Sequence, residues 1–209
     1  MFINFEGVDG SGKTTQLKML ADYLTSKQID YTSTKEPGGT ELADKIRELI
    51  IHEEMSELTR LLLVNASRLE NVKQIIQPAL KAGRVVLCDR FVDSTLVYQG
   101  LKAGLGVDIV QKMHAMLLNN IMPDVTFYLS ITPEQALERI SSRELFNNFD
   151  KQTAQNIHLM IDCYESIYFK GQNSDLHSKT QIVKINAYRA VESVFSEIKT
   201  YINKALGLF

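Results

Sequence analysis

The stretch Phe5–Gln16, FEGVDGSGKTTQ, decides the fold of this chain. Residues 7–14 match the pattern G-x-x-x-x-G-K-[ST], whose glycines let the backbone curl so that N–H groups point at phosphate oxygens. In such a loop Lys13 reaches the β- and γ-phosphates and the hydroxyl of Thr14 binds Mg²⁺. The apolar run at 2–5 predicts a buried strand before the loop, and the apolar spacing from 14 to about 27 predicts a helix after it. This context favours a P-loop over a chance glycine-rich turn.

The P-loop and the start of its helix are the expected site of a nucleoside triphosphate, because the helix adds the positive end of its dipole to the loop's N–H groups. The residues expected to contact it are Gly7, Val8, Asp9, Gly10, Ser11, Gly12, Lys13, Thr14 and Thr15. The loop indicates the phosphoryl donor but not the acceptor, since GTPases, motor ATPases and small-molecule kinases all carry it.

The rest of the chain alternates strands with helices. Strands are predicted at 31–35, 84–89, 124–131 and 181–186, and helices at 41–50, 57–81, 107–119, from Pro133 to near 142, 153–169 and 190–205. This alternation predicts an α/β fold of three layers, with a central, mostly parallel sheet covered by helices on both faces. No linker divides the chain, so residues 1–209 are predicted to form one domain. Ligands bind such sheets at the carboxyl ends of the strands.

Composition excludes several classes of protein. The formal net charge of −2 lacks the basic surplus of proteins that grip a nucleic-acid backbone, so no polymeric nucleic acid is expected as a partner. No apolar run approaches the ~20 residues of a membrane span, and the N-terminus has no signal-peptide pattern. Cys88 and Cys163 fall in no metal-binding spacing and are expected to be reduced, buried thiols. We therefore expect a cytoplasmic protein that needs no membrane.

Two charged residues follow the strand at 84–89. Asp89 ends it as a magnesium-side carboxylate of this class often does, although a helix cap or a surface charge is the simpler alternative. Arg90 comes next and is suited to clamp a second phosphate through two parallel N–H groups, or else to pair with a surface carboxylate. Thr14 and Asp89 are thus the predicted metal-binding pair.

Several motifs together make the chain resemble the bacterial-type thymidylate kinases. They are EGVDGSGKTTQ (6–16), EPGGT (36–40), ASR (66–68) and DRFVDSTLVYQG (89–100), which match that family in order and spacing. The resemblance implies a P-loop fold with a small mobile lid, here at about 141–153, and a homodimer. It implies transfer of the γ-phosphate of ATP, with Mg²⁺, to the 5′-phosphate of dTMP, giving dTDP for DNA precursor synthesis. An acceptor that is already a phosphate needs no strong general base, so positioning and charge neutralisation suffice.

The resemblance also implies roles for individual residues. Asp9 faces the deoxyribose 3′-hydroxyl, Arg90 clamps the dTMP phosphate, and Tyr98 packs beside the sugar. The other expected contacts with the monophosphate are Glu36, Arg47, Val64, Arg68, Thr95 and Gln99. Of these, Arg68 bonds the thymine carbonyl edge, Thr95 and Gln99 complete that edge, and Arg47 lines the phosphate pocket. The simpler alternatives are an exposed helix arginine for Arg47 and a core aromatic for Tyr98.

Three positions depart from the family pattern. Val64 stands where an aromatic usually stacks on thymine, and a nearby ring such as Phe91 is one candidate to compensate. Lys35 replaces an arginine before EPGGT, which keeps the charge and loses the fork geometry. In the lid, Asn148 stands where an arginine often neutralises the transferring phosphoryl group. The family resemblance then leaves Arg143 as the expected catalytic arginine beside Lys13 and Arg90, with Arg139 as its alternative or as a contact for adenine.

Three other functions remain open from the sequence. A P-loop GTPase switch would need an N-K-x-D sequence after a strand, and the chain's Asn203–Lys204 lies instead in a predicted helix. A nucleoside kinase would need a carboxylate base, for which Glu36 is a candidate. A kinase for another pyrimidine monophosphate, dUMP or UMP, is the nearest alternative, because Val64 changes the base pocket and one methyl group is worth only ~1 kcal/mol there.

Overall fold

The computed structural model describes residues 1–141, 148–170 and 176–208. In this part of the chain, a five-stranded sheet has the order β2-β3-β1-β4-β5, and every strand pair is parallel. The strands are β1 (Phe2–Glu6), β2 (Tyr31–Lys35), β3 (Val85–Asp89), β4 (Val125–Ser130) and β5 (Gln181–Asn186). The predicted α/β fold with a parallel central sheet is confirmed.

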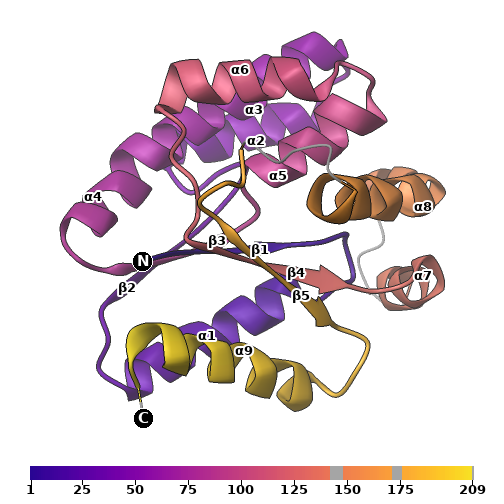
Figure 1. The fold of residues 1–209 in the computed structure, drawn as a ribbon. Coiled ribbons are helices and arrows are strands. Elements are labelled where there is room, and N and C mark those ends of the chain that lie inside the picture. The colour runs from indigo at the N-terminus through magenta and orange to yellow at the C-terminus, as the bar shows by residue number, and fades with distance from the viewer. Residues whose placement is uncertain (142–147, 171–175, 209) are drawn as a thin grey trace.

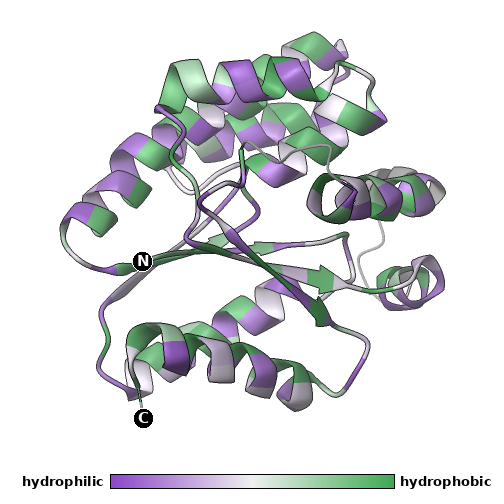
Figure 2. Cartoon of the chain, in the orientation of Figure 1, coloured by the Kyte–Doolittle hydropathy of each residue, from purple (hydrophilic) through white to green (hydrophobic). Residues whose placement is uncertain are grey.

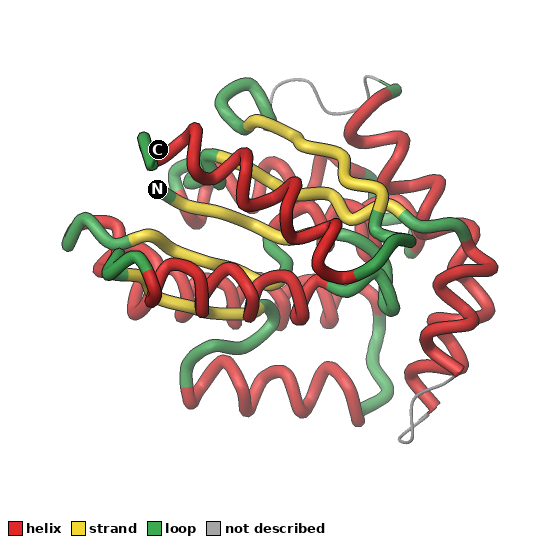
Figure 3. The backbone as a smooth tube through the Cα atoms, turned by 90° about the horizontal axis from the view of Figure 1, so that it is seen from below, coloured by secondary structure: helices red, strands yellow, loops and turns green. Residues whose placement is uncertain are grey.

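The helices form two layers around this sheet. The helical elements are α1 (Lys13–Ser26), α2 (Glu41–His52), α3 (Glu57–Asn71), η1 (Val72–Ile76), α4 (Gln77–Lys81), α5 (Val92–Thr95), η2 (Leu96–Lys102), α6 (Val107–Leu118), α7 (Pro133–Ser141), α8 (Asn148–Phe169) and α9 (Val191–Leu206). Helices α1 and α9 cover one face, and the group from α2 to α6 covers the other (Figure 1). The view from below shows the helix that leads to the C-terminus lying across the strands (Figure 3).

The central strands of the sheet are buried from solvent. All five residues of β1 are buried, as are the first four of β3 and the first five of β4. Burial on both faces is what a parallel sheet under two helical layers requires. The colours of Figure 2 agree, with hydrophobic strands in the centre and helices that carry both hydrophilic and hydrophobic residues. Among the described residues, none of the helices has both the length and the apolar character to span a membrane.

The strand register places the motifs side by side. Phe5 of β1 pairs with Asp89 of β3, and Lys35 of β2 pairs with Asp89 from the other side. The P-loop follows β1, the EPGGT turn follows β2, and the DRF motif follows β3. The three motifs therefore meet at the carboxyl edge of the sheet, where ligands bind in folds of this kind.

The helices differ from the prediction in three places. The helix predicted over 57–81 is present, but its turns widen to a π-helix in η1, two residues before Pro78, which has no N–H to donate. The helical stretch 92–102 was not predicted, because the motif there was interpreted only as a functional signature. Helix α8 begins at Asn148, whereas the prediction started it near 153. Residues 148–153 include no glycine or proline, so they can continue a helix.

Part of the predicted lid at about 141–153 lies outside the described residues. Residues 142–147 are not described, and Arg143 lies among them. Its predicted catalytic role therefore stays a prediction.

Candidate phosphoryl-transfer site

The P-loop backbone depends on its glycines. Gly7, Gly10 and Gly12 have φ values of 142°, 83° and 93°, which side-chain-bearing residues rarely adopt. A Cβ on Gly7 would lie 2.7 Å from the carbonyl oxygen of Leu129 in β4. The loop therefore packs tightly against the neighbouring strand, and helix α1 begins directly after it at Lys13. This places free N–H groups and the positive end of the helix dipole at one point.

Lys13 is buried inside the loop. Its Nζ donates to the carbonyl oxygens of Gly7 (3.0 Å) and Val8 (3.1 Å) and lies 3.9 Å from a carboxylate oxygen of Asp9. Burial, helped by the positive charge of Arg90, lowers the pKa of Lys13 to about 8, while Asp9 opposes this shift. The ammonium group is thus poorly stabilised by the protein alone, and an anionic phosphate beside it would supply the missing charge.

The two predicted metal ligands are in contact. The hydroxyl of Thr14 donates to a carboxylate oxygen of Asp89 over 2.6 Å. Within the described residues, no group of three or more His, Cys, Asp or Glu side chains gathers to hold a metal ion. A hydroxyl and one carboxylate nevertheless fit Mg²⁺ well, because this ion is usually bound by one or two protein oxygens together with substrate phosphates and water.

Arg90 is held by groups from three elements. Its backbone φ is 74°, in the left-handed region, and its N–H donates to the carbonyl of Phe5 (3.0 Å). Its Nη2 donates to Asp9 (2.6 Å), and its Nη1 donates to the hydroxyls of Ser94 (3.0 Å) and Tyr164 (3.1 Å). The guanidinium thus lies beside the P-loop, in contact with Asp9.

Two further predicted residues border this guanidinium group. The ring of Tyr98 lies under it, with 5.5 Å between the ring centroid and the guanidinium carbon. Burial raises the pKa of Tyr98, so the phenol is neutral at physiological pH. Arg47 on α2 donates from Nη1 to the carbonyl of Pro37 in the EPGGT turn (2.9 Å). Arg47 is therefore tied to the turn at the edge of the site, and is not a free surface arginine.

Arg68 forms a second buried cluster. Its Nε donates to Glu36 (2.6 Å), and its Nη2 donates to the hydroxyl of Thr95 (2.7 Å) and the carbonyl of Phe91 (3.3 Å). Its Nη1 is buried and has no hydrogen-bond partner among the described residues. Arg68 itself is only 1% exposed, so an unsatisfied donor on it is costly. A ligand carbonyl at Nη1 would satisfy it.

Glu36 is committed to this cluster. It accepts hydrogen bonds from Arg68 and from the amide of Asn71 (3.3 Å). Burial raises the pKa of Glu36, and the positive charge of Arg68 acts against that shift. Glu36 is therefore the ionic partner of a buried arginine rather than the free carboxylate base that a nucleoside kinase requires.

A cavity of about 270 Å³ opens on the other side of the P-loop. It is lined by Gly10, Ser11, Gly12, Thr15, Gln16, Arg139, Ala187, Arg189, Val191 and Val194. Arg139 donates to the carbonyls of Gly10 (3.2 Å) and Ala187 (2.9 Å), and its guanidinium carbon lies 5.4 Å from the centroid of the Tyr188 ring. The cavity has apolar walls, two arginines and backbone N–H groups, which suits the purine of a nucleoside triphosphate whose phosphates enter the P-loop.

Comparison with known proteins identifies the family of this chain. The family model described as thymidylate kinase matches residues 5–198. The chain belongs to the thymidylate kinase family. A thymidylate kinase of Rickettsia typhi is 45% identical over 167 residues, covering 80% of this chain and 79% of that protein. One of Rickettsia bellii is 39% identical over 204 residues, covering 97% and 95%. A crystal structure of the Ehrlichia chaffeensis thymidylate kinase superposes with a TM-score of 0.75 at 28% identity, covering 97% and 98%.

Family membership decides between the functions that the sequence left open. A thymidylate kinase is an enzyme that uses ATP as phosphoryl donor, so the GTPase switch is set aside. The hydrogen bonds of Glu36 with Arg68 and Asn71 argue independently against a nucleoside kinase, because they leave no free carboxylate base there.

The predicted base pocket of this chain departs from the family pattern at Val64. Val64 is 8% exposed and lies on α3 one turn before Arg68. Phe91 does not replace the absent stacking ring, because its side chain is fully buried. Its ring centroid lies 5.1 Å from that of Phe2 and 5.8 Å from that of His114. Phe91 is therefore a core residue under Arg68, and our suggestion that it compensates for Val64 was wrong.

Of the other predicted base contacts, Thr95 and Gln99 are buried near Arg68 in sequence-adjacent helical turns, and their contact with a base stays a prediction. Thr95 is 1% exposed and bonded to Arg68, and Gln99 is 8% exposed, one turn further along the same helical stretch. Lys35 is exposed, and its Nζ lies 4.0 Å from Asp44 on α2. Its charge thus faces the surface side of the EPGGT turn.

Sequence analysis missed four residues of this region. Arg189 lines the cavity beside the P-loop, and its position just after β5, at the carboxyl edge of the sheet, was the available signal. Glu6, Ser94 and Tyr164 surround Arg90. For Glu6 the signal was a carboxylate at the end of a buried, mostly apolar strand. Ser94 and Tyr164 carried no comparable signal.

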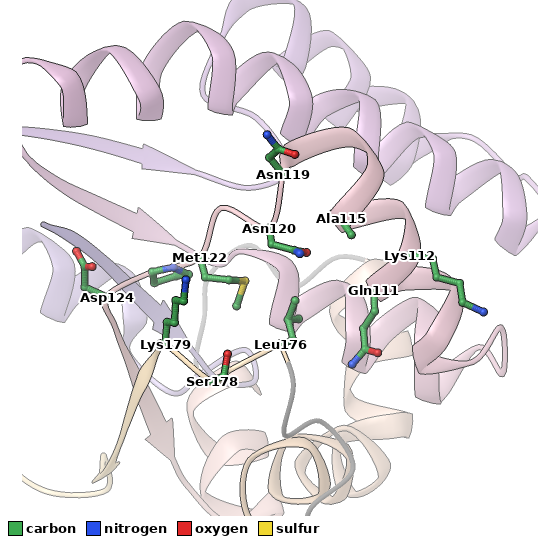
Figure 4. A pocket seen from close by; sticks show the side chains of 11 residues that line it. Gln111, Lys112, Ala115, Asn119, Asn120, Met122, Asp124, Leu176, Ser178 and Lys179 are labelled. Carbon is green, nitrogen blue, oxygen red and sulfur yellow. The ribbon is translucent and has the colours of Figure 1, made fainter.

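A second cavity, of about 720 Å³, lies away from this site (Figure 4). Its lining comes from α6, from the turn before β4 and from the residues before β5: Gln111, Lys112, Ala115, Asn119, Asn120, Met122, Pro123, Asp124, Leu176, Ser178 and Lys179. It therefore sits at the amino ends of β4 and β5, opposite the P-loop edge, and contains none of the predicted site residues.

Proposed function

We propose that this protein transfers the γ-phosphate of ATP to the 5′-phosphate of dTMP, giving ADP and dTDP for DNA precursor synthesis in the cytoplasm. One observation carries the proposal most. Asp9 of the P-loop lies 2.6 Å from Arg90 and 3.9 Å from Lys13. The lysine proposed to bind the donor phosphates and the arginine proposed to clamp the acceptor phosphate therefore share one carboxylate. Two phosphates held by Lys13 and Arg90 would therefore lie next to each other, as direct transfer requires.

The donor half of the site consists of the P-loop and the 270 Å³ cavity. The triphosphate lies on the loop N–H groups and Lys13, and the purine enters between Arg139 and Arg189. Thr14 and Asp89 would hold Mg²⁺, which would supply positive charge to offset that of the phosphates. Residues 7–15 bind the phosphates mainly through backbone groups, which explains why the loop's conformation depends on glycine.

The acceptor half consists of Arg90 and the Arg68 cluster. Arg90 holds and neutralises the 5′-phosphate, Arg47 lines the far side of that pocket, and Asp9 accepts from the 3′-hydroxyl. Nη1 of Arg68 donates to a thymine carbonyl, with Thr95 and Gln99 at the same edge. Val64 supplies an apolar wall without stacking. Tyr98 lies beside the sugar, where it would crowd a 2′-hydroxyl.

The chemistry of transfer needs no general base in this arrangement. The acceptor phosphate is already anionic, and the residues that surround it supply positive charge and position. Arg139 is bonded to two backbone carbonyls at the purine cavity, which leaves Arg143 of the lid, at about 141–153, as the arginine that reaches the transferring group.

A second copy of the chain is the proposed partner. The most exposed large apolar side chains of α2, α3 and α6 are Leu42, Leu49, Leu58, Leu62 and Met116, each 47–76% exposed. Helix α3 packs against both α2 and α6, so the three helices form one layer, and we take the exposed side chains on them as one apolar face. An apolar face that one monomer leaves open is the expected core of a homodimer interface.

The direct test measures ADP release from ATP and Mg²⁺ with dTMP, dUMP, UMP, dCMP and dGMP, each alone. Strong turnover with dTMP and a lower rate with dUMP is the expected result. Preference for UMP or dUMP would mean that the pocket around Val64 selects another pyrimidine, and the roles of Arg68, Thr95 and Gln99 would be wrong. ADP release that no monophosphate stimulates would refute the acceptor site as a whole.

A further inference from the structure

Glu6 is a buried carboxylate that accepts hydrogen bonds at both of its oxygens. It ends β1 directly before Gly7 and is 0% exposed. Its Oε1 accepts from the backbone N–H groups of Phe91 (2.7 Å) and Ser94 (3.3 Å) and from the amide of Asn4 (3.3 Å). Burying a carboxylate is expensive unless such bonds compensate for it. These bonds involve only protein groups, so any function of Glu6 must act through the residues that it positions.

The second oxygen of Glu6 leads to Arg90. Oε2 accepts from the hydroxyls of Ser94 (2.8 Å) and Tyr164 (2.8 Å). Each hydroxyl has one proton, and both protons are directed to Glu6, so the oxygen lone pairs face the other way. Nη1 of Arg90 donates to these same two oxygens, at 3.0 and 3.1 Å. Glu6 thus orients both hydroxyls as acceptors for Arg90.

The same carboxylate fixes the backbone of the segment. Arg90 has a φ of 74°, which a residue with a side chain adopts only when its surroundings impose it. The backbone N–H of Arg90 donates to the carbonyl of Phe5 in β1, and the next N–H, of Phe91, donates to the side chain of Glu6. β1 therefore fixes Arg90 in two ways: Phe5 binds its backbone N–H, and Glu6 acts on its side chain through Ser94 and Tyr164.

We propose that Glu6 is a positioning residue for phosphoryl transfer, which acts through Ser94 and Tyr164 to aim the guanidinium of Arg90 at the acceptor phosphate. With Nη1 anchored, the edge of the guanidinium that carries Nη2 faces Asp9 and the site. The inference rests on the proposed role of Arg90 as the acceptor clamp. Tyr164 lies on α8, so the network also joins the helix that follows the lid region to the clamp.

Charge explains why a carboxylate serves here better than a neutral side chain. Burial raises the pKa of Glu6, and the nearby Asp93 adds to this shift, whereas Arg90 and the bonds from Phe91 and Ser94 lower it. An ionised Glu6 accepts at both oxygens. A glutamine of the same shape would place an NH₂ group against donors, so at least one of the two hydroxyls would have to turn its proton toward Arg90.

The first experiment compares E6Q, S94A and Y164F with the unaltered protein. We expect each to lower kcat/KM for dTMP, E6Q by about 100-fold and the other two by about tenfold, while KM for ATP changes less than about twofold. The matched control is Y168F, one helical turn along α8, which removes a partly buried hydrogen bond that the phenol donates to Asp93 (2.9 Å) rather than to Glu6. Y168F should keep kcat/KM for dTMP within about twofold.

The decisive experiment repeats these changes in an R90A background. If Glu6 acts through Arg90, then E6Q and Y164F should have almost no additional effect there, because the group that they position is gone. Full additivity in R90A would overturn the inference, as would equal losses for ATP and dTMP in E6Q. R90A alone with undiminished kcat/KM for dTMP would instead refute the clamp role in the proposed function. Circular dichroism and thermal unfolding check each variant; if E6Q does not fold, S94A and Y164F carry the test.

Discussion

The hydroxyl of Thr14 donates a 2.6 Å hydrogen bond to Asp89, and so joins the first turn of α1 to the end of β3. Residues 75 positions apart meet because β1 and β3 are neighbours in register, with Phe5 opposite Asp89. The pair presents two hard oxygen ligands at the mouth of the P-loop, where Mg²⁺ accompanies a nucleoside triphosphate.

The change D89N should weaken Mg²⁺ binding, because it replaces a charged oxygen ligand by a neutral amide. We expect the Mg²⁺ concentration for half-maximal activity to rise about tenfold or more, with excess Mg²⁺ restoring part of kcat. Titration of activity with Mg²⁺ at fixed ATP measures this. D108N, at an exposed aspartate of α6, is the control and should give the original curve. An unchanged curve for D89N would exclude Asp89 from the metal site.

Lys13 should make the stability of the ligand-free protein depend on pH. Its pKa is about 8 in the folded state, against 10.5 as the ordinary value, so between these values the unfolded chain binds more protons. Stability from this group therefore rises as pH increases from 8 to 10.5, by up to roughly 3 kcal/mol. K13M lacks this term, so the unfolding free energy of the original protein minus that of K13M should rise across that window. Urea unfolding at pH 7 to 10.5 measures it, and a constant difference would contradict the buried-charge account.

The main parts of the site were predictable because local motifs lie at the ends of strands. Asp89 ends β3, Arg90 follows it directly, and Lys13 comes after the P-loop that follows β1. Parallel strands bring such positions to one edge of the sheet. The strand order was not needed for that inference. The same logic would have found Arg189, which follows β5, had it been applied to the last strand.

The network around Arg90 was not predictable for a physical reason. Glu6, Ser94 and Tyr164 come from β1, α5 and α8, and separations of 88 and 158 positions along the chain give no local pattern. The burial of Phe91 could not be predicted for the same reason, since only the folded structure shows its ring packed against Phe2.

Glu36 and Arg68 should be coupled in stability as well as in binding. Both are buried, at 3% and 1% exposure, and removing one partner of such a pair leaves an uncompensated charge. We expect E36A to lower the free energy of unfolding by about 3–5 kcal/mol, whereas E36A/R68M should lose less than E36A alone. Chemical denaturation of the two variants tests this. A double variant that loses as much stability as E36A, or more, would contradict the coupling.

Arg139 and Arg189 should affect ATP and not dTMP, since both line the cavity on the donor side of the P-loop. We expect R139A and R189A each to raise KM for ATP about fivefold to tenfold, the equivalent of about 1 kcal/mol of lost contact. KM for dTMP should stay within about twofold. R84A, at an exposed arginine before β3, is the control for a lost surface charge. A rise in KM for dTMP as large as that for ATP would place the purine elsewhere.

The apolar face of α2, α3 and α6 should hold two copies of the chain together. Leu62 on α3 is 54% exposed, and a lysine there would have to bury its charge in a dimer, which is costly. We expect the original protein to sediment as a dimer at micromolar concentration, and L62K to dissociate at least about tenfold more readily. The matched control is L159K, because Leu159 on α8 is exposed to a similar extent, 46%, outside this face. Sedimentation that L159K alters as much as L62K would move the interface to α8, and a monomeric original protein would exclude it altogether.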